Sequence, residues 1–135
     1  MVKQYFGDGS KWGVSIQYVQ ENKPLGTAGS LGLLPKNKIK LPFIMMNADL
    51  LTNINFRTLL EYHNEQKSFA TMCVREYNYQ VPFGVVEIEK QFVTSIVEKP
   101  VQNFFVNAGI YVFEPKLIGE ADGENYLDMP KLLEK

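Results

Sequence analysis

The sequence predicts an α/β protein, a three-layer α/β/α sandwich built around a mixed, mostly parallel sheet. The first observation is the run Phe43-Ile44-Met45-Met46, whose four consecutive apolar residues are typical of a strand buried on both faces. The second is a similar apolar run at residues 68–74, and the third is a helical pattern between the two. We therefore expect residues 43–47 to form a central strand, parallel to residues 69–74 and joined to them by a right-handed crossover helix.

The crossover helix is expected over residues 55–66. Phe56, Leu59, Leu60 and His63 recur at the i, i+3, i+4 and i+7 positions, which place side chains on one face of a helix. His63 therefore lies on or beside the packed face. A histidine at the edge of the core explains this position better than a ligand or a catalyst.

Composition sets the broad class and excludes several functions. A chain of 135 residues with 45% hydrophobic content is expected to form one globular domain over residues 1–135. The net charge of -1 gives no reason to expect binding to nucleic acid or to an acidic membrane. Cys73 is the only cysteine, so we expect no intrachain disulfide, a buried and inert thiol, and a cytoplasmic location. No apolar run approaches the roughly 20 residues of a membrane span.

Glycines mark the first part of the chain. The segment Gly7-Asp8-Gly9-Ser10-Lys11-Trp12-Gly13 lacks the spacing of a P-loop and predicts a turn, and residues 14–19 alternate enough to predict a strand. In residues 21–32 the glycines stand three apart, unlike the G-x-G-x-x-G dinucleotide motif. These glycines either let a flat ligand approach the backbone closely or provide loop flexibility, and the residues alone leave both explanations open.

A carboxylate directly follows the first apolar strand. Asp49 stands at the predicted carboxyl end of that strand, where open α/β sheets bind their ligands. The alternative is that Asp49 and Thr52 only begin the next helix, a position that such residues favour.

The second half of the chain has a different pattern. Residues 84–97 alternate, turn at Lys90-Gln91 and alternate again, which predicts a hairpin with one wet face. Lys99 precedes Pro100 and is therefore expected to be extended. Residues 104–113 predict another strand, interrupted at Asn107-Ala108-Gly109, where a glycine suggests close approach of a ligand or a second backbone. Residues 128–134 predict a short final helix.

Five short motifs occur in a fixed order along almost the whole chain. They are Glu21-x-x-Pro24-Leu25-Gly26-Thr27-Ala28-Gly29, Asn47-Ala48-Asp49, Pro82-Phe83-Gly84-Val85-Val86, Glu98-Lys99-Pro100 and Asn107-Ala108-Gly109. Each motif is weak alone, but together they resemble the sugar-1-phosphate nucleotidyltransferases. The resemblance is nearest to the mannose-1-phosphate guanylyltransferase-like group, among members that carry regulatory CBS domains on the same polypeptide.

The resemblance implies a Rossmann-like fold of the nucleotide-diphospho-sugar transferase type and suggests a central fragment of the catalytic domain. The family begins with a strand and a G-G-x-G-x-R-L-type loop that wraps the triphosphate, and we expect the chain to begin after that loop. The family's second metal-binding aspartate is expected downstream, since Asp128 does not stand in its motif. We therefore expect the fragment alone to be inactive.

The resemblance also implies the chemistry. Such enzymes join a nucleoside triphosphate to a sugar 1-phosphate and release pyrophosphate, so positioning and charge neutralisation dominate. Catalytic roles fall on Asp49, which would hold Mg²⁺, and on Lys99, which would place a charge on the sugar phosphate. The other implied contacts come from two sets. Nucleotide binding is assigned to Glu21, Pro24, Gly26 and Thr27, and sugar-phosphate binding to Gly84, Glu98, Lys99, Asn107 and Gly109.

Glu21 bears on the choice of base. Thymidylyl- and uridylyltransferases commonly carry glutamine at the corresponding place, whose amide suits a pyrimidine edge. An ionised carboxylate only accepts hydrogen bonds, and it matches the adjacent N1–H and N2–H₂ donors of guanine. We therefore expect GTP to be favoured. We also expect a homo-oligomer and a possible CBS regulatory domain in the parent chain.

Two other functions compete with this interpretation. The first is a nucleotide-sugar-dependent glycosyltransferase on a similar sheet, but that class commonly presents Asp-x-Asp to its metal, whereas this chain has Asn47-Ala48-Asp49. The second is a non-catalytic regulatory subunit that binds a sugar nucleotide or a partner domain. A G-x-G-x-R loop encoded upstream would favour the enzyme over that subunit.

Overall fold

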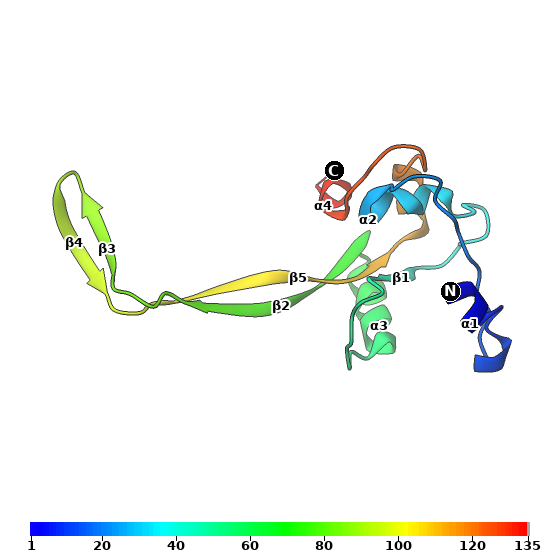
Figure 1. Ribbon diagram of the computed structural model, residues 1–135, viewed down its shortest axis with the longest axis horizontal. Coiled ribbons are helices and arrows are strands. Elements are labelled where there is room, and N and C mark those ends of the chain that lie inside the picture. Colours follow the sequence, from blue (N-terminus) through cyan, green and yellow to red (C-terminus); the bar gives the residue numbers. More distant parts are fainter. Residues whose placement is uncertain (135) are drawn as a thin grey trace. The chain divides into compact units, whose positions relative to one another are not determined.

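The computed structural model describes residues 1–134, which fall into two compact units. The first unit combines residues 1–43 with residues 113–134, and the second unit is the continuous stretch 44–112 (Figure 1). The α/β class is confirmed, but both sheets are antiparallel and the three-layer sandwich with a mostly parallel sheet is not confirmed. The expectation of a single domain stays a prediction. Within residues 1–134, no helix is both long and apolar enough to cross a bilayer.

The first unit consists of short helical segments. Its core is formed by apolar side chains from both of its sequence stretches. The first stretch contributes Leu25, Ala28 and Leu31, and the second contributes Leu117 and Ile118. The segments are α1 (Val2–Phe6), η1 (Ser10–Trp12), α2 (Gly26–Gly29), η2 (Ser30–Leu33), η3 (Pro115–Glu120) and α4 (Met129–Leu133). The predicted final helix is confirmed by α4.

The strand predicted at residues 14–19 is wrong, because these residues form no helix or strand. They follow a tight turn in which Gly9 and Gly13 have φ values of 86° and 70°. The backbone of Ile16 then donates a hydrogen bond to the Asp8 carbonyl at 2.7 Å. An alternating sequence becomes a strand only when a neighbouring strand takes up its hydrogen bonds, and the sheets of this chain provide none here.

The glycines spaced three apart form a tightly packed face in the first unit. A Cβ atom on Gly26 would lie 2.7 Å from the Leu127 carbonyl oxygen, and one on Gly29 would lie 3.0 Å from the Asn125 carbonyl oxygen. Gly32 packs equally tightly against Gly123. The backbone that approaches these glycines closely is therefore another segment of the same chain.

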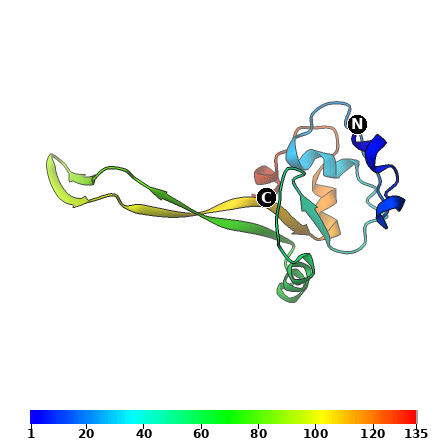
Figure 2. The same ribbon diagram turned by 60° about the horizontal axis from the view of Figure 1, so that its bottom comes forward.

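The second unit is organised around β5 (Val101–Phe113). Its three-stranded sheet has the order β1-β5-β2, with β1 at Phe43–Met46 and β2 at Ala70–Gln80. The expectation that residues 43–47 form the central strand is wrong, since β1 lies at an edge and is only partly buried. β2 and β5 run side by side as a long ribbon in both views (Figures 1 and 2). Phe43, the first residue of β1, and Phe113, the last residue of β5, both belong to the first unit and pack edge to face with ring centroids 6.0 Å apart.

Helix α3 (Phe56–Gln66) confirms the helix predicted between the two apolar strands, although β5 separates these strands in the sheet. Asn55 caps its first turn, because its side-chain oxygen accepts hydrogen bonds from the backbone of Arg57 and Thr58. Lys67 ends it in the left-handed region at φ 51°. His63 is fully buried on the packed face, and its Nδ1 lies 2.8 Å from the Thr71 hydroxyl of β2, as expected of a core histidine.

The predicted hairpin is confirmed as β3 (Val85–Glu89) and β4 (Phe92–Val97), at the far end of the β2–β5 ribbon (Figure 2). The register pairs Glu87 with Ser95 but Ile88 with Val93, so Thr94 is the extra residue of a β-bulge. The Thr94 hydroxyl donates to the Glu87 carbonyl at 3.2 Å. Because paired residues share a face, the bulge gathers apolar side chains on one face. They are Val86, Ile88, Val93 and Ile96.

Candidate functional site

The site begins where two of the sequence motifs meet in the second unit. The backbone N–H of Asn47, directly after β1, donates to the Gly109 carbonyl in β5 at 3.0 Å. Gly109 has φ +71°, and a Cβ atom there would lie 2.7 Å from the Asn47 side-chain nitrogen. Only glycine fits both the left-handed backbone and the space beside Asn47. The motifs Asn47-Ala48-Asp49 and Asn107-Ala108-Gly109 are therefore in direct contact.

Asn107 fixes the local backbone of β5 at Gly109. Its Oδ1 accepts the Gly109 N–H at 2.8 Å, and its Nδ2 donates to the Tyr111 hydroxyl at 2.6 Å. Both ends of the Asn107 amide thus have partners inside the protein. In this structure the asparagine positions the backbone beside Asn47.

Asp49 lies on an exposed turn immediately after this contact. Within residues 1–134, no three Asp, Glu, His or Cys side chains gather as a protein-made metal cage would need. Mg²⁺ in enzymes that handle phosphates is commonly held by one or two carboxylates together with the phosphates of the substrate. A single exposed carboxylate at this position fits that mode of binding.

An open cavity of about 530 Å³ lies next to this turn. Its walls come from the segment after Asp49, from β2 and from β5, and they are mainly apolar. The residues are Leu50, Leu51, Thr52, Asn53, Ile54, Cys73, Val74, Arg75, Val106, Asn107, Ala108 and Ile110. This volume and this mixture of apolar walls with a few polar groups are typical of a small-molecule site. Cys73 is half-buried, and burial raises the pKa of its thiol, which disfavours the reactive thiolate form.

Arg75 is the residue of this cavity that sequence reasoning missed. It lies in β2, one residue beyond the apolar run that predicted the strand. The signal was present, because side chains two apart in a strand share a face and Arg75 stands two residues after Cys73. What the sequence did not show was the cavity on that face.

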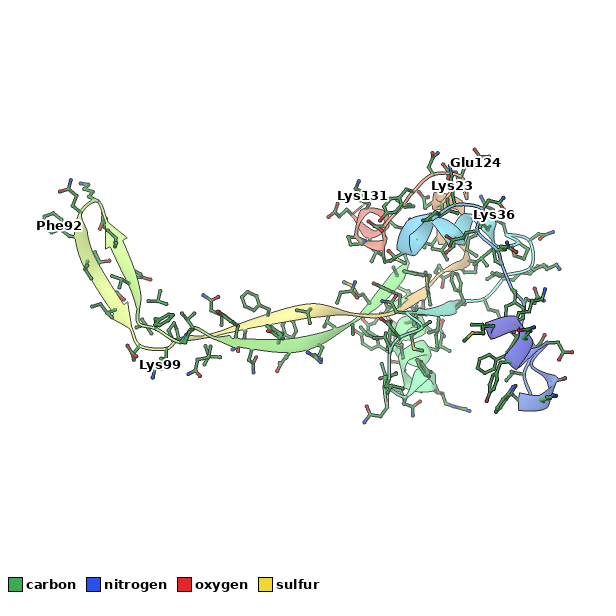
Figure 3. All side chains as sticks on the ribbon, in the orientation of Figure 1. Lys23, Lys36, Phe92, Lys99, Glu124 and Lys131 are labelled. Carbon is green, nitrogen blue, oxygen red and sulfur yellow. The ribbon has the colours of Figure 1, made fainter. Side chains whose placement is uncertain are left out.

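Gly84, Glu98 and Lys99 form a separate group at the junction of the ribbon and the hairpin. A Cβ atom on Gly84 would lie 3.0 Å from the Glu98 carboxylate, and the Lys99 N–H donates to the Phe83 carbonyl at 3.3 Å. Figure 3 labels Lys99 at this junction. Six residues of extended β5 separate Val101 from Asn107, a distance of roughly 20 Å. The structure therefore does not bring Lys99 to the cavity beside Asn107.

The extended backbone expected at Lys99 is wrong, since this residue has φ 46°. A non-glycine residue in the left-handed region is strained, and the following proline adds to the restriction. The hydrogen bond from the Lys99 N–H to Phe83, with one from the Gln80 side chain to the Lys99 carbonyl at 3.3 Å, holds it there.

The predicted nucleotide loop lies in the first unit. The Glu21 carboxylate accepts a hydrogen bond from the Leu25 backbone at 3.2 Å and so braces the loop that contains Pro24. Gly26 has φ 78° and packs on Leu127, and the Thr27 hydroxyl accepts the Met129 N–H at 2.8 Å. These residues are thus brought together, and two of them also join the loop to the start of α4.

A second hollow of about 340 Å³ lies beside this loop. Its lining residues are Gln20, Asn22, Lys23, Leu25, Leu33, Gly123 and Glu124, and Figure 3 labels Lys23 and Glu124 on this unit. The turn at residues 122–125 is held by Asp122, whose carboxylate accepts the N–H groups of Glu124 and Asn125, each at 2.8 Å. These bonds lower the pKa of Asp122 to about 2. Sequence reasoning did not identify this turn.

Comparison with known proteins adds the family context. The nucleotidyl transferase family model matches residues 1–132. A mannose-1-phosphate guanyltransferase of Yarrowia lipolytica is 34% identical over 119 residues, covering 83% of this chain and 32% of the relative. One of Pichia angusta is 35% identical over 124 residues, covering 87% and 33%. The mannose-1-phosphate guanylyltransferase catalytic subunit beta of Drosophila pseudoobscura pseudoobscura is 31% identical over 124 residues, covering 87% and 33%. The chain thus spans about a third of the length of these curated relatives.

Solved structures show the same fold. HddC from Yersinia pseudotuberculosis superposes with a TM-score of 0.62 at 23% identity, over 93% of this chain and 56% of that one. A putative glucose-1-phosphate thymidylyltransferase from Bacillus anthracis, crystallised with a sucrose, gives 0.61 at 23% identity, over 95% and 62%. HddC complexed with GMP-PN gives 0.60 at 24% identity, over 95% and 60%.

Proposed function

This chain belongs to the nucleotidyl transferase family, and from that premise we propose that the full-length protein joins a nucleoside triphosphate to a sugar 1-phosphate, giving a nucleoside diphosphate sugar and pyrophosphate. The observation that carries the proposal is the contact between Asn47 and Gly109. This contact ties the start of the Asp49 turn to β5, and Leu50, the residue after Asp49, lines a cavity of suitable size for a small ligand.

In this reaction a sugar-phosphate oxygen attacks the α-phosphorus in line and pyrophosphate leaves, so no covalent enzyme intermediate is needed. Asp49 would hold Mg²⁺, which supplies charge that offsets the repulsion between the two anions. Asn107 and Gly109 hold the turn beside Asp49 in shape. Gly84, Glu98 and Lys99, which the resemblance assigns to the sugar and its phosphate, lie about 20 Å from this cavity along β5, so we do not propose them as contacts of a ligand bound there.

We propose guanine as the base. The guanylyltransferase relatives support this choice, and so does the carboxylate of Glu21. That carboxylate accepts the Leu25 N–H through one oxygen, but its two oxygens have about four lone-pair sites between them. It therefore keeps the capacity to accept the two adjacent N–H donors of guanine while it braces the loop with Pro24, Gly26 and Thr27.

The proposal is tested by pyrophosphate release from the full-length protein with GTP, Mg²⁺ and mannose 1-phosphate. Asp49→Asn is expected to remove most of the activity, because loss of one preorganised charge costs several kcal/mol of transition-state stabilisation. Glu61→Gln, which changes an exposed carboxylate of α3, is the matched control and keeps full activity. Activity of Asp49→Asn equal to that of Glu61→Gln contradicts the assignment.

We further propose that residues 1–135 alone do not catalyse the transfer. Asp49 is the single carboxylate that we assign to the metal, and the proposed reaction needs charge on both phosphates. Pyrophosphate release by the 135-residue chain above a no-enzyme blank, lost in Asp49→Asn, would overturn this.

A further inference from the structure

The cavity beside the Asp49 turn has a single charged side chain in its wall. Of its lining residues, Arg75 alone carries a charge, and no carboxylate stands among them. Thr52, Asn53 and Asn107 are the neutral polar members. The rest of the wall is apolar, and Arg75 is exposed at the open side of the cavity, where a ligand can reach it. This cavity is therefore suited to an anion.

The guanidinium of Arg75 is not occupied by the protein itself. Within the stretch 1–134, it makes neither a hydrogen bond nor an ion pair. The neighbouring carboxylate, Glu76, follows Arg75 in β2 and therefore points to the opposite face of the ribbon. There Glu76 lines a different hollow with Asn78 and Asn103. Arg75 thus keeps its charge and its five donors for a ligand.

We propose that Arg75 binds the phosphate of the sugar 1-phosphate in this cavity, an inference that rests on the proposed function. A planar guanidinium matches two oxygens of a phosphate monoester. Asn107 and Ala108 of the same wall lead directly into Gly109, and Leu50 of the wall follows Asp49. An anion held by Arg75 therefore shares its cavity with the residue that directly follows the proposed metal carboxylate. Lys99, which the motif suggested for this role, lies before the start of β5, at the junction with the hairpin.

The Thr52 hydroxyl adds a second donor to the same wall. Its oxygen accepts the Ile54 N–H at 3.2 Å, which fixes the side chain and leaves the hydroxyl proton to donate. Arg75 supplies charge and Thr52 a neutral hydrogen bond, so the arginine dominates affinity for the phosphate while the sugar contributes separately.

The test is calorimetric titration of the full-length protein with mannose 1-phosphate, mannose and inorganic phosphate. Arg75→Gln is expected to weaken mannose 1-phosphate binding about 10- to 100-fold, the factor that corresponds to hydrogen bonds with a charged group. Arg75→Lys keeps the charge but loses the bidentate geometry, so its affinity for mannose 1-phosphate is expected to lie between those of the wild type and Arg75→Gln. Affinity for GTP stays unchanged. Arg57→Gln, which alters the only other arginine of this sequence, leaves every affinity unchanged.

Thermal unfolding of each variant verifies the fold, and Arg75→Lys serves if Arg75→Gln does not fold. Unchanged mannose 1-phosphate binding by both Arg75 variants overturns the inference. So does a loss in Lys99→Gln that exceeds the loss in Arg75→Gln. If the wild-type protein binds inorganic phosphate through Arg75 but forms no nucleotide sugar from any triphosphate, the proposed function fails and the anion site stands. If the enzyme is active and Arg75→Gln binds normally, only the anion site fails.

Discussion

Thr27 and Asp128 hold each other across 101 residues of sequence. The Thr27 N–H donates to the Asp128 carboxylate at 3.4 Å, while the Thr27 hydroxyl accepts the N–H of Met129, the residue after Asp128, at 2.8 Å. The Asp128 carboxylate therefore accepts an N–H from the first turn of α2, and the Thr27 hydroxyl accepts an N–H from the first turn of α4. The first unit is joined at this point by side chains that satisfy backbone groups at two helix starts.

Removing the Thr27 hydroxyl is expected to destabilise the first unit. Thr27→Val keeps the shape of the side chain but leaves the Met129 N–H without its acceptor, at a cost of about 1 kcal/mol. Thr27→Ser keeps the hydroxyl and is expected to stay close to wild type. Urea unfolding of the two variants measures the difference, and equal midpoints would show that the bond contributes nothing.

Gly109→Ala is expected to damage the candidate site and the fold around it. A non-glycine residue at φ +71° costs about 1–2 kcal/mol, and the new methyl group would displace the Asn47 side chain. Gly119→Ala is the matched control, because nothing lies within 4 Å of a Cβ atom at that position. In the full-length protein we expect reduced stability and reduced nucleotidyl transfer for Gly109→Ala alone. Wild-type activity in that variant would show that the turn tolerates a side chain.

Glu21→Gln is expected to change the preference for the base. The amide can donate as well as accept, so it suits thymine and uracil better than the carboxylate does and suits guanine less. Initial rates with GTP, dTTP and UTP at equal concentration in the full-length protein provide the measurement. The assignment of Glu21 is wrong if the variant keeps the wild-type preference, or if the wild type already prefers dTTP, UTP or CTP.

The turn at residues 122–125 is expected to weaken in acid. Hydrogen bonds from the Asn125 and Glu124 backbones lower the pKa of Asp122 from 3.8 to about 2. A carboxyl whose folded pKa is depressed contributes stability above its unfolded pKa and loses it as the pH falls through the folded pKa. Between pH 4 and about 2, wild type should therefore lose more stability than Asp122→Asn, as followed by thermal unfolding. Parallel curves for the two proteins would contradict this.

The apolar face of the β3–β4 hairpin is expected to cause residues 1–135 to self-associate. Its four side chains are 44%, 66%, 58% and 68% exposed at Val86, Ile88, Val93 and Ile96, and an isolated two-stranded hairpin is marginal in water. Ile96→Lys should shift light-scattering mass toward the monomer, whereas Ser95→Lys, on the opposite face, should not. A wild-type monomer at high concentration would rule the idea out.

Local signals in the sequence predicted the elements that depend on neighbouring residues. Helix α3 ends where its capping residues stand, and the hairpin turns at Lys90, which adopts φ 59°. The order of the strands depends on pairing between distant segments. For that reason the apolar run of β1 was assigned to the centre, although β5 occupies it.

The candidate site also combines features that depend on neighbouring residues with features that depend on distant segments of the chain. The motifs around Asp49 and Gly109 were found from residue types, and the structure brings their neighbours Asn47 and Gly109 into contact. Arg75 was missed because its importance depends on a cavity formed by three separate segments. The spacing of Gly26 and Gly29 left open whether a ligand approaches the backbone there or the loop is only flexible, and in the structure the backbone of residues 122–128 packs there.

The division of the chain into two units has a consequence for the order of folding. The core of the first unit joins Leu25, Ala28 and Leu31 to Met129 and Leu132, so during synthesis it cannot close until residue 132 has left the ribosome. The second unit is continuous in sequence and emerges complete beforehand. At a typical 5–20 residues per second, the early glycine-rich segment stays without its packing partner for several seconds. Its short helices are too small to persist alone, so the closing of the long loop between residues 29 and 125 is expected to limit the rate at which the first unit folds.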